Sequence, residues 1–116
     1  MKYMLLMYAD ESKVPQTLEA QQAAAPVWSA LAEQMKAAGV WLSSSGLSPI
    51  ANTTTLRVRE GKTLITDGPF AETHEQLGGY FLLECNEFDE ALPWASRIPT
   101  AKYGSIEICP LWGQEE

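Results

Sequence analysis

Two segments of the chain are apolar on both of their alternating faces, which is the pattern of strands that are covered on both sides of a sheet. The first segment spans residues 2–9 and reads KYMLLMYA, and the second spans residues 80–85 and reads YFLLEC. A sheet built around these two strands needs apolar cover on both faces. This requirement constrains the fold more than any other feature of the sequence.

The rest of the chain alternates between helical and strand patterns. Residues 16–39 have helical apolar spacing, with Gly39 placed as a C-terminal stop, and Pro26 predicts either a kink or a new helix start. Asn86 is placed as the N-cap of a second helix with an apolar face. We expect a short strand at 40–42, a polar connection at 43–49 and a hairpin of 53–59 and 62–66 around Glu60 and Gly61. A loop or a short helical turn follows at 71–77, and the last strand is expected at 103–109.

This order of elements predicts one α+β domain over residues 1–116 with a ferredoxin-like βαββαβ plan and an added β-hairpin. Two helices cover only one face of such a sheet, whereas the central strands are apolar on both. The remaining face therefore needs a second cover. We expect a twofold homodimer in which two sheets pack face to face.

Charge and composition exclude several classes of function. The chain has 8 Lys and Arg against 15 Asp and Glu, a formal net charge of −7, which disfavours direct binding to nucleic acid. No apolar run reaches the roughly 18 residues that a membrane helix needs. The apolar start ends at Asp10, too early for a signal peptide. Cys85 and Cys109 lack metal-type spacing, which is typical of reduced thiols in a cytoplasmic protein.

The segment 66–80, TDGPFAETHEQLGGY, strongly resembles the DGPF branch of the YCII-related proteins. Supporting similarity includes the opening MKYMLL, the stretch RVREGK at 57–62 and YGSIE at 103–107. The resemblance implies a dimeric α+β barrel. It also implies a pocket with His and Asp, a likeness to muconolactone isomerase, and, for DGPF members, an association with extracytoplasmic-function sigma factors.

Asp67 and His74 are the candidate catalytic residues. The Asp67 carboxylate can act as a general base beside a rigid turn, or it can fix that turn by accepting from the backbone N–H of Phe70. His74 is the only histidine and the only side chain with an unperturbed pKa near neutrality. It can serve as a proton shuttle, or it can be a solvated residue of a polar segment.

Five further residues are candidates for ligand binding. Arg57 and Arg59 share a strand face and can clamp an anion, although charges on a hairpin edge also discourage unwanted strand pairing. Asp10, Tyr80 and Tyr103 can line a pocket, although tyrosines in strands more often serve packing. The sequence has no metal constellation, phosphate loop or nucleotide fingerprint, so we expect no metal and no cofactor.

Two classes of function follow from these residues together with what the family resemblance implies. The first is a cytoplasmic dimer whose pocket binds or transforms a small polar or anionic metabolite by Asp/His acid–base chemistry, in the manner of a cofactor-independent isomerase or lyase, or senses it without turnover. The alternative is a non-enzymatic accessory or regulatory module that acts with a sigma factor. A concave pocket with convergent polar groups favours the first, and an exposed apolar patch favours the second.

Overall fold

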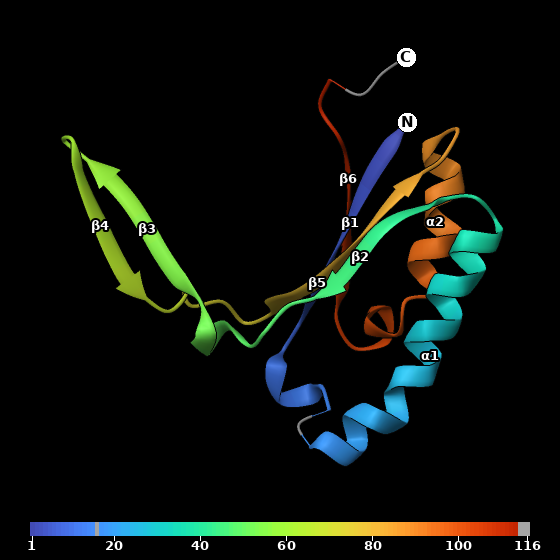
Figure 1. The fold of residues 1–116 in the computed structure, drawn as a ribbon, viewed down its shortest axis with the longest axis horizontal. Coiled ribbons are helices and arrows are strands. Elements are labelled where there is room, and N and C mark those ends of the chain that lie inside the picture. Colours follow the sequence, from blue (N-terminus) through green and yellow to red (C-terminus); the bar gives the residue numbers. More distant parts are fainter. Residues whose placement is uncertain (16, 114–116) are drawn as a thin grey trace.

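The computed structural model describes residues 1–15 and 17–113, so the predicted helix start at Gln16 and the acidic tail at 114–116 lie outside it. Strands and helices alternate along the chain (Figure 1). In order they are β1 (Lys2–Ala9), η1 (Glu11–Lys13), α1 (Leu18–Ala37), β2 (Trp41–Gly46), η2 (Ile50–Asn52), β3 (Thr54–Arg59), β4 (Lys62–Asp67), β5 (Gln76–Glu84), α2 (Phe88–Ser96), η3 (Pro99–Lys102) and β6 (Ser105–Pro110), where η marks a short 3-10 helix.

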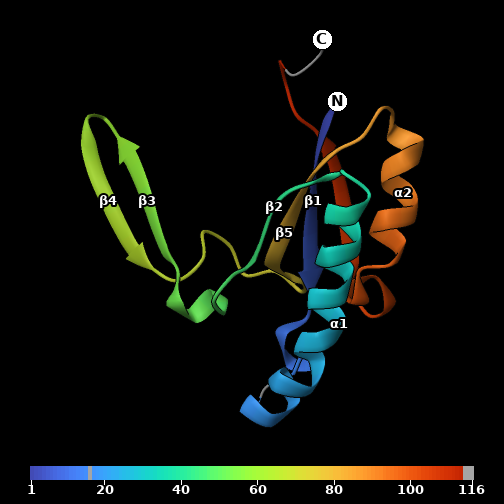
Figure 2. The same cartoon turned by 45° about the vertical axis from the view of Figure 1, so that its right-hand side comes forward.

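The main sheet is antiparallel, with the strand order β2-β5-β1-β6, which is the ferredoxin-like arrangement that the sequence predicts. Both long helices lie on one side of this sheet (Figures 1 and 2). The hairpin is a separate two-stranded sheet inserted between β2 and β5. The α+β class and the added hairpin are therefore confirmed.

Strand β1 separates two apolar environments. Tyr3, Leu5 and Met7 are buried on the helix side, where they pack with residues such as Met35 and Leu83. The alternate residues of β1 and β5 point to the face that no helix covers, and they are only half-buried. These are Lys2, Met4, Leu6 and Tyr8 of β1, and Tyr80, Leu82 and Glu84 of β5. Cys109 pairs with Met4 on this face and is also half-buried.

Strand β2 is longer than the sequence indicates. It spans Trp41–Gly46, so Ser43, Ser44 and Ser45 belong to a strand and not to the predicted polar connection. Pairing with β5 satisfies their backbone groups at this edge of the sheet. Side-chain bonds support the strand, since Ser43 Oγ shares a hydrogen bond with the Tyr80 hydroxyl at 2.9 Å and Trp41 Nε1 donates to Ser44 Oγ at 3.0 Å. Serine lowers the strand signal in the sequence, but tertiary pairing overrides it.

Helix α1 follows one of the two predicted alternatives at Pro26, whereas the N-cap of α2 differs from its predicted position. Helix α1 begins after Thr17, whose hydroxyl accepts from the Ala20 N–H, and it continues through Pro26 without a new start. Its axis changes direction along its length (Figures 1 and 2), which agrees with a kink. Helix α2 has Glu87, not Asn86, as its N-cap. The Asn86 N–H instead donates to the Glu90 carboxylate, which draws the first turn together.

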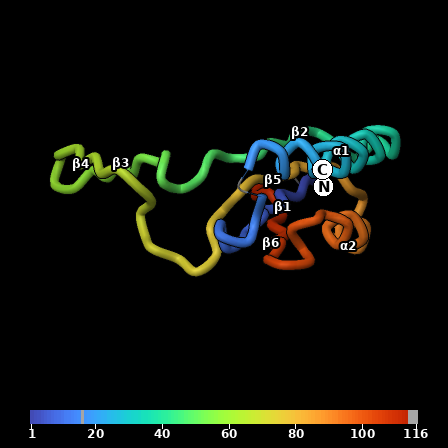
Figure 3. Tube along the Cα trace, turned by 90° about the horizontal axis from the view of Figure 1, so that it is seen from below, coloured from blue at the N-terminus to red at the C-terminus, as the bar shows by residue number. Residues whose placement is uncertain are grey.

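The hairpin projects from the body of the molecule. Its turn residues Glu60 and Gly61 both have positive φ, 51° and 75°, which matches the twist of a two-residue hairpin and confirms the predicted turn. The chain measures 46 × 43 × 19 Å, with a radius of gyration of 16.1 Å. A compact domain of this length has a radius near 13 Å. The excess reflects the hairpin, which extends away from the layered body (Figure 3).

Adjacent glycines in β5 provide a test of the packing between β2 and β5. A Cβ at Gly79 would lie 2.7 Å from the Ser45 carbonyl oxygen and 2.6 Å from Met7 Cε, whereas a Cβ at Gly78 would meet only an ordinary contact of 3.9 Å. We expect Gly79→Ala to lower the free energy of unfolding by about 1–3 kcal/mol, and Gly78→Ala to change it by less than about 0.5 kcal/mol. Urea unfolding measures both values, and equal effects would contradict this account of the strand contact.

Candidate functional site

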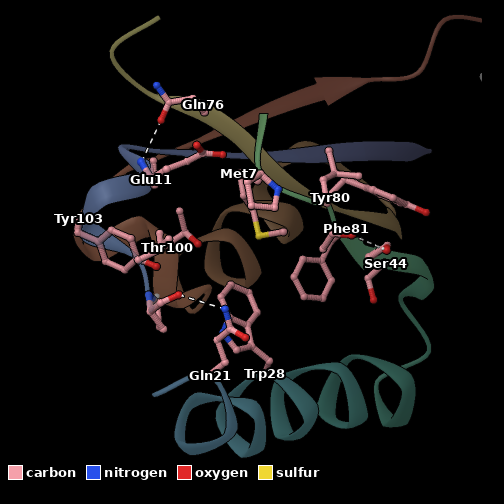
Figure 4. A pocket seen from close by; sticks show the side chains of 18 of the residues that line it. Met7, Glu11, Gln21, Trp28, Ser44, Gln76, Tyr80, Phe81, Thr100 and Tyr103 are labelled. Atoms are coloured by element: carbon pink, nitrogen blue, oxygen red, sulfur yellow. Dashed lines mark hydrogen bonds between the residues drawn. The ribbon is translucent and has the colours of Figure 1, made fainter. Parts of the chain in front are cut away.

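The candidate site is a cavity of about 680 Å³ between α1 and the helix-facing side of the sheet (Figure 4). Its wall is assembled from α1, from the ends of β1, β2 and β5, and from the segments that follow β1 and α2. A volume of this size is within the range of small-molecule sites. The fold therefore provides a concave site on the side of the sheet that the helices cover.

Apolar side chains form the inner wall of the cavity. Met7 and Phe81 project from adjacent central strands, and Trp28 faces them from α1 (Figure 4). The Trp28 and Phe81 rings are stacked, with centroids 6.4 Å apart and an interplanar angle of 14°. Trp28 lies on the apolar face of its helix, so the sequence pattern marks it as packing and gives no separate signal of a cavity.

Polar groups enter the cavity from its rim. Ser44, Thr100 and Tyr103 contribute hydroxyl groups, and Glu11 contributes a carboxylate (Figure 4). The Gln76 amide joins Glu11 of the rim to the segment that precedes β5, since its oxygen accepts from the Glu11 N–H at 2.9 Å and its nitrogen donates to the Thr73 carbonyl at 2.6 Å. Apart from Tyr103, these residues were missed by sequence reasoning, because they come from four segments that only the fold brings together.

Tyr80 and Tyr103 both line the cavity. Tyr103 is 37% exposed, and its hydroxyl makes no hydrogen bond within the described ranges 1–15 and 17–113. The Tyr80 side chain projects from the helix-free face of β5, where its hydroxyl pairs with Ser43. Of the two tyrosines, Tyr103 is thus the one with an available hydroxyl at the site.

Asp10 and His74 lie near one another, outside the cavity lining. The Asp10 carboxylate caps η1 by accepting from the Ser12 hydroxyl at 2.7 Å and from the Ser12 N–H at 2.9 Å. These two bonds lower the pKa of Asp10, and the nearby positive form of His74 lowers it further. The fold thus brings a predicted binding residue, half-buried Asp10, near a predicted catalytic residue, exposed His74.

Asp67 is exposed at the end of β4. No hydrogen bond or ion pair joins its side chain to His74, nor does it accept from the Phe70 N–H, within the part of the chain that the structure describes. The predicted turn-fixing bond to Phe70 is therefore wrong. Backbone and hydroxyl groups hold this turn instead, since the Gly68 N–H donates to the Thr53 carbonyl at 2.8 Å and Thr55 Oγ1 donates to the Gly68 carbonyl at 2.8 Å.

Arg57 and Arg59 lie on the projecting hairpin and are absent from the cavity lining. Arg57 Nη2 donates to the Phe70 carbonyl at 3.4 Å, and Arg59 Nη1 donates to the neighbouring Val58 carbonyl at 3.1 Å. Their guanidinium groups share one face of the hairpin with Lys62. The structure therefore groups the predicted anion clamp with the hairpin and separates it from the cavity.

The cysteines are both free thiols. Cys85 is buried and Cys109 is half-buried, and burial is the main cause that raises the pKa of each above its usual value. They are consequently protonated, weakly nucleophilic groups at neutral pH. Across residues 1–15 and 17–113 there is no group of three or more potential metal-binding side chains, and no helix long and apolar enough to cross a membrane.

Comparison with known proteins assigns the chain to a family. A model of the YCII-related domain matches residues 1–113, which is nearly the whole sequence. An uncharacterised protein of Rhizobium meliloti (strain 1021) is 38% identical over 114 residues, which cover 96% of this chain and 92% of that relative. The protein belongs to the YCII-related family. The predicted membership of the YCII-related family is confirmed, and the assignment to its DGPF branch stays a prediction.

The acidity of Asp10 tests the local geometry beside His74. Ser12→Ala removes a hydroxyl donor, so we expect the Asp10 pKa to rise toward its usual value of about 3.9. His74→Gln should raise it less, because the imidazole is a smaller cause than the Ser12 hydroxyl. An NMR titration of the Asp10 carboxyl carbon measures both shifts, and the opposite ranking would contradict the described contacts.

The hydrogen bond from the Ser12 hydroxyl to Asp10 also has a defined effect on the free energy of unfolding. A lowered folded-state pKa stabilises the protein above the unfolded-state pKa, and this contribution disappears as the pH falls through the folded value. The loss of stability caused by Ser12→Ala should accordingly shrink as the pH falls below about 4. Chemical unfolding of both proteins across this range is the measurement, with Ser96→Ala as the comparison, because the Ser96 hydroxyl donates to the Pro93 carbonyl and to no carboxylate.

Proposed function

We propose that the protein binds a small, largely apolar molecule in the cavity between α1 and the sheet. The observation that carries this proposal is the apolar wall of Met7, Trp28 and Phe81 beneath a rim of hydroxyl groups. Ligand sites commonly combine an apolar wall with a few placed polar groups that orient the ligand. This combination supports a metabolite-binding protein of the YCII-related family.

The charge of the cavity favours an uncharged ligand over an anionic one. Glu11 is the charged side chain in the lining, and the hairpin guanidinium groups do not reach it. The chain as a whole has a formal net charge of −7. A carboxylate or phosphate in the cavity would face this acidic surrounding, whereas a carbonyl or hydroxyl group can bond to the Ser44, Thr100 and Tyr103 hydroxyls without repulsion.

The described geometry supports binding more strongly than Asp/His acid–base turnover. Asp67 and His74 are both absent from the cavity lining. A general acid or base must lie within hydrogen-bonding reach of the reacting group. We therefore propose a sensor or carrier of a neutral metabolite. A role of Asp67 and His74 in an isomerase- or lyase-like reaction remains a separate prediction.

The uncovered face of the sheet supports a homodimer. Met4, Leu6 and Leu82 are apolar and only half-buried on this face. Monomeric proteins rarely leave a large contiguous apolar surface in water. We propose that a second copy covers it, with the two sheets face to face in the dimeric α+β barrel that the DGPF motif also implies.

A protein partner is the second candidate function, and one observation favours it. The hairpin exposes Leu56, Val58 and Ile65, an apolar patch of the kind expected for an accessory module. The DGPF-type motif connects such a module with an extracytoplasmic-function sigma factor. Binding of a purified sigma factor to the wild-type protein, measured by calorimetry, separates this function from metabolite binding.

Lactones and their ring-opened hydroxy acids test the nature of the ligand. The two forms share one carbon skeleton and differ mainly in charge, and a ligand raises Tm only by binding the folded state. We expect lactones with an aliphatic tail to raise Tm more than the corresponding acids do. Thermal-shift titration measures the difference. Greater stabilisation by the acids would contradict a neutral ligand, and the absence of any stabilising lactone would count against the binding proposal.

Filling the cavity tests its location. Ala32 lines the cavity, whereas Ala23 is an exposed residue of the same helix. We expect Ala32→Phe to abolish the Tm shift caused by a stabilising lactone, and Ala23→Phe to retain it, because only the first substitution occupies the ligand's volume. Calorimetric titration of both variants provides the affinities. Equal affinities would place the ligand elsewhere.

Single hydroxyl and carboxylate changes test which groups contact the ligand. We expect Tyr103→Phe to weaken binding about tenfold through one lost hydrogen bond. Tyr8→Phe is the matched control, because the Tyr8 hydroxyl bonds Glu107 on the other side of the sheet. Asp67→Asn should also leave affinity unchanged. A loss of binding in Asp67→Asn with normal stability would instead support the catalytic prediction for this residue.

A further inference from the structure

We propose that the β3–β4 hairpin is a dimerisation arm whose apolar face packs against a second copy of this chain. The inference rests on the proposed homodimer and assigns a specific element to its interface. It concerns residues 54–67, which lie outside both the main sheet and the cavity.

The two faces of the arm differ in chemistry. Residues directly opposite in an antiparallel pair share a face, so Leu56 and Ile65 lie together, with Val58 next to them. These three side chains are 59%, 66% and 55% exposed, respectively. The opposite face carries Arg57, Arg59 and Lys62 together with Leu64. One side of the arm is thus mainly charged, and the other holds an exposed apolar cluster of Leu56, Val58 and Ile65, flanked by Thr54, Thr63 and Asp67.

An isolated hairpin of this kind is poorly stabilised in water. Two-stranded hairpins are marginal unless a third strand or another apolar surface packs on them. Among the described residues, β3 and β4 pack extensively only on each other. The regular pairing from Thr54–Asp67 to Arg59–Lys62 therefore needs a surface that a single chain does not provide.

A second copy is the occupant that the arrangement fits. The helices and the arm lie on opposite sides of the main sheet, so the arm lies on the same side as the uncovered face (Figures 1 and 2). A partner sheet that packs on this face comes alongside the arm. In a twofold dimer this contact occurs twice. One symmetric interface then covers both the open sheet face and the apolar side of the arm in each chain.

Charge supports the same occupant. The arm holds three of the 8 Lys and Arg residues of a chain that has 15 Asp and Glu, so the rest of the chain is strongly acidic. Glu107 lies on the uncovered sheet face, opposite Leu6 in the strand register. Arg57, Arg59 and Lys62 lie on the arm face that points away from the packed sheet, so they lower the long-range repulsion between two chains of net charge −7 without contacting Glu107 directly.

Neighbouring substitutions on opposite faces of the arm test this assignment. Ile65 and Thr66 are adjacent and both exposed, and Ile65→Asp and Thr66→Asp add the same charge to the same strand. We expect the wild type and Thr66→Asp to be dimers, and Ile65→Asp to raise the dimer dissociation constant at least about tenfold. Sedimentation velocity across the micromolar range measures the mass, and circular dichroism verifies that each variant is folded.

Crosslinking identifies the surface that the arm contacts. A benzophenone amino acid at position 65, in a mixture of isotope-labelled and unlabelled chains, distinguishes contacts within one chain from contacts between two. We expect crosslinks between chains, from position 65 to peptides of β1, β5 or β6 that contain Met4, Leu82 or Cys109. This readout does not depend on the stability of the Asp variants.

The outcomes separate the arm from the dimer. A monomeric wild type would contradict both proposals. If the wild type is a dimer and Ile65→Asp weakens it no more than Thr66→Asp does, the proposed contact of the arm is overturned and the dimer is not. The same holds if position 65 crosslinks only within each chain. If the protein is a monomer and Ile65→Asp alone loses affinity for a sigma factor, the arm binds that partner. This result would also overturn the packing of the arm on a second copy.

Discussion

The position of β1 between β5 and β6 is the constraint on which the rest of the structure depends. Its alternating side chains must be apolar in both directions, because one set forms the core beneath the helices and the other faces the uncovered side of the sheet. Leu5 is fully buried within the chain, whereas Leu6 is not. A single strand thus separates the interior of the monomer from the surface that we assign to a partner.

The parts of the fold that local patterns determine could be predicted from the sequence. Strands with two apolar faces, the Glu60-Gly61 turn and the order of elements all depend on residues close in the chain, and each is present in the structure. The serine-rich half of β2 could not be predicted, because its stability comes from pairing with β5 and from bonds such as Ser43–Tyr80. Contacts between distant segments therefore determine this half of the strand, which intrinsic strand propensity alone does not predict.

The candidate site was less predictable than the fold for a physical reason. Conspicuous polar residues such as Asp67 and Arg59 lie on the hairpin, while the cavity is formed by Trp28, Phe81 and Thr100, which the sequence marks as ordinary packing residues or not at all. A concave surface depends on how distant segments are spaced. The sequence reveals which side chains are reactive, but it does not reveal which of them line the same cavity.

The connections of the hairpin have a consequence for ligand affinity. The chain enters the hairpin through residues 47–53, which include Leu47 and Pro49 of the cavity rim, and leaves it through residues 68–75, which precede Gln76 of the same rim. A shift of the hairpin that moved these segments would therefore move both sides of that rim. If a ligand and a second chain favoured the same placement of the connections, each would strengthen the binding of the other by the same factor, because linkage is reciprocal.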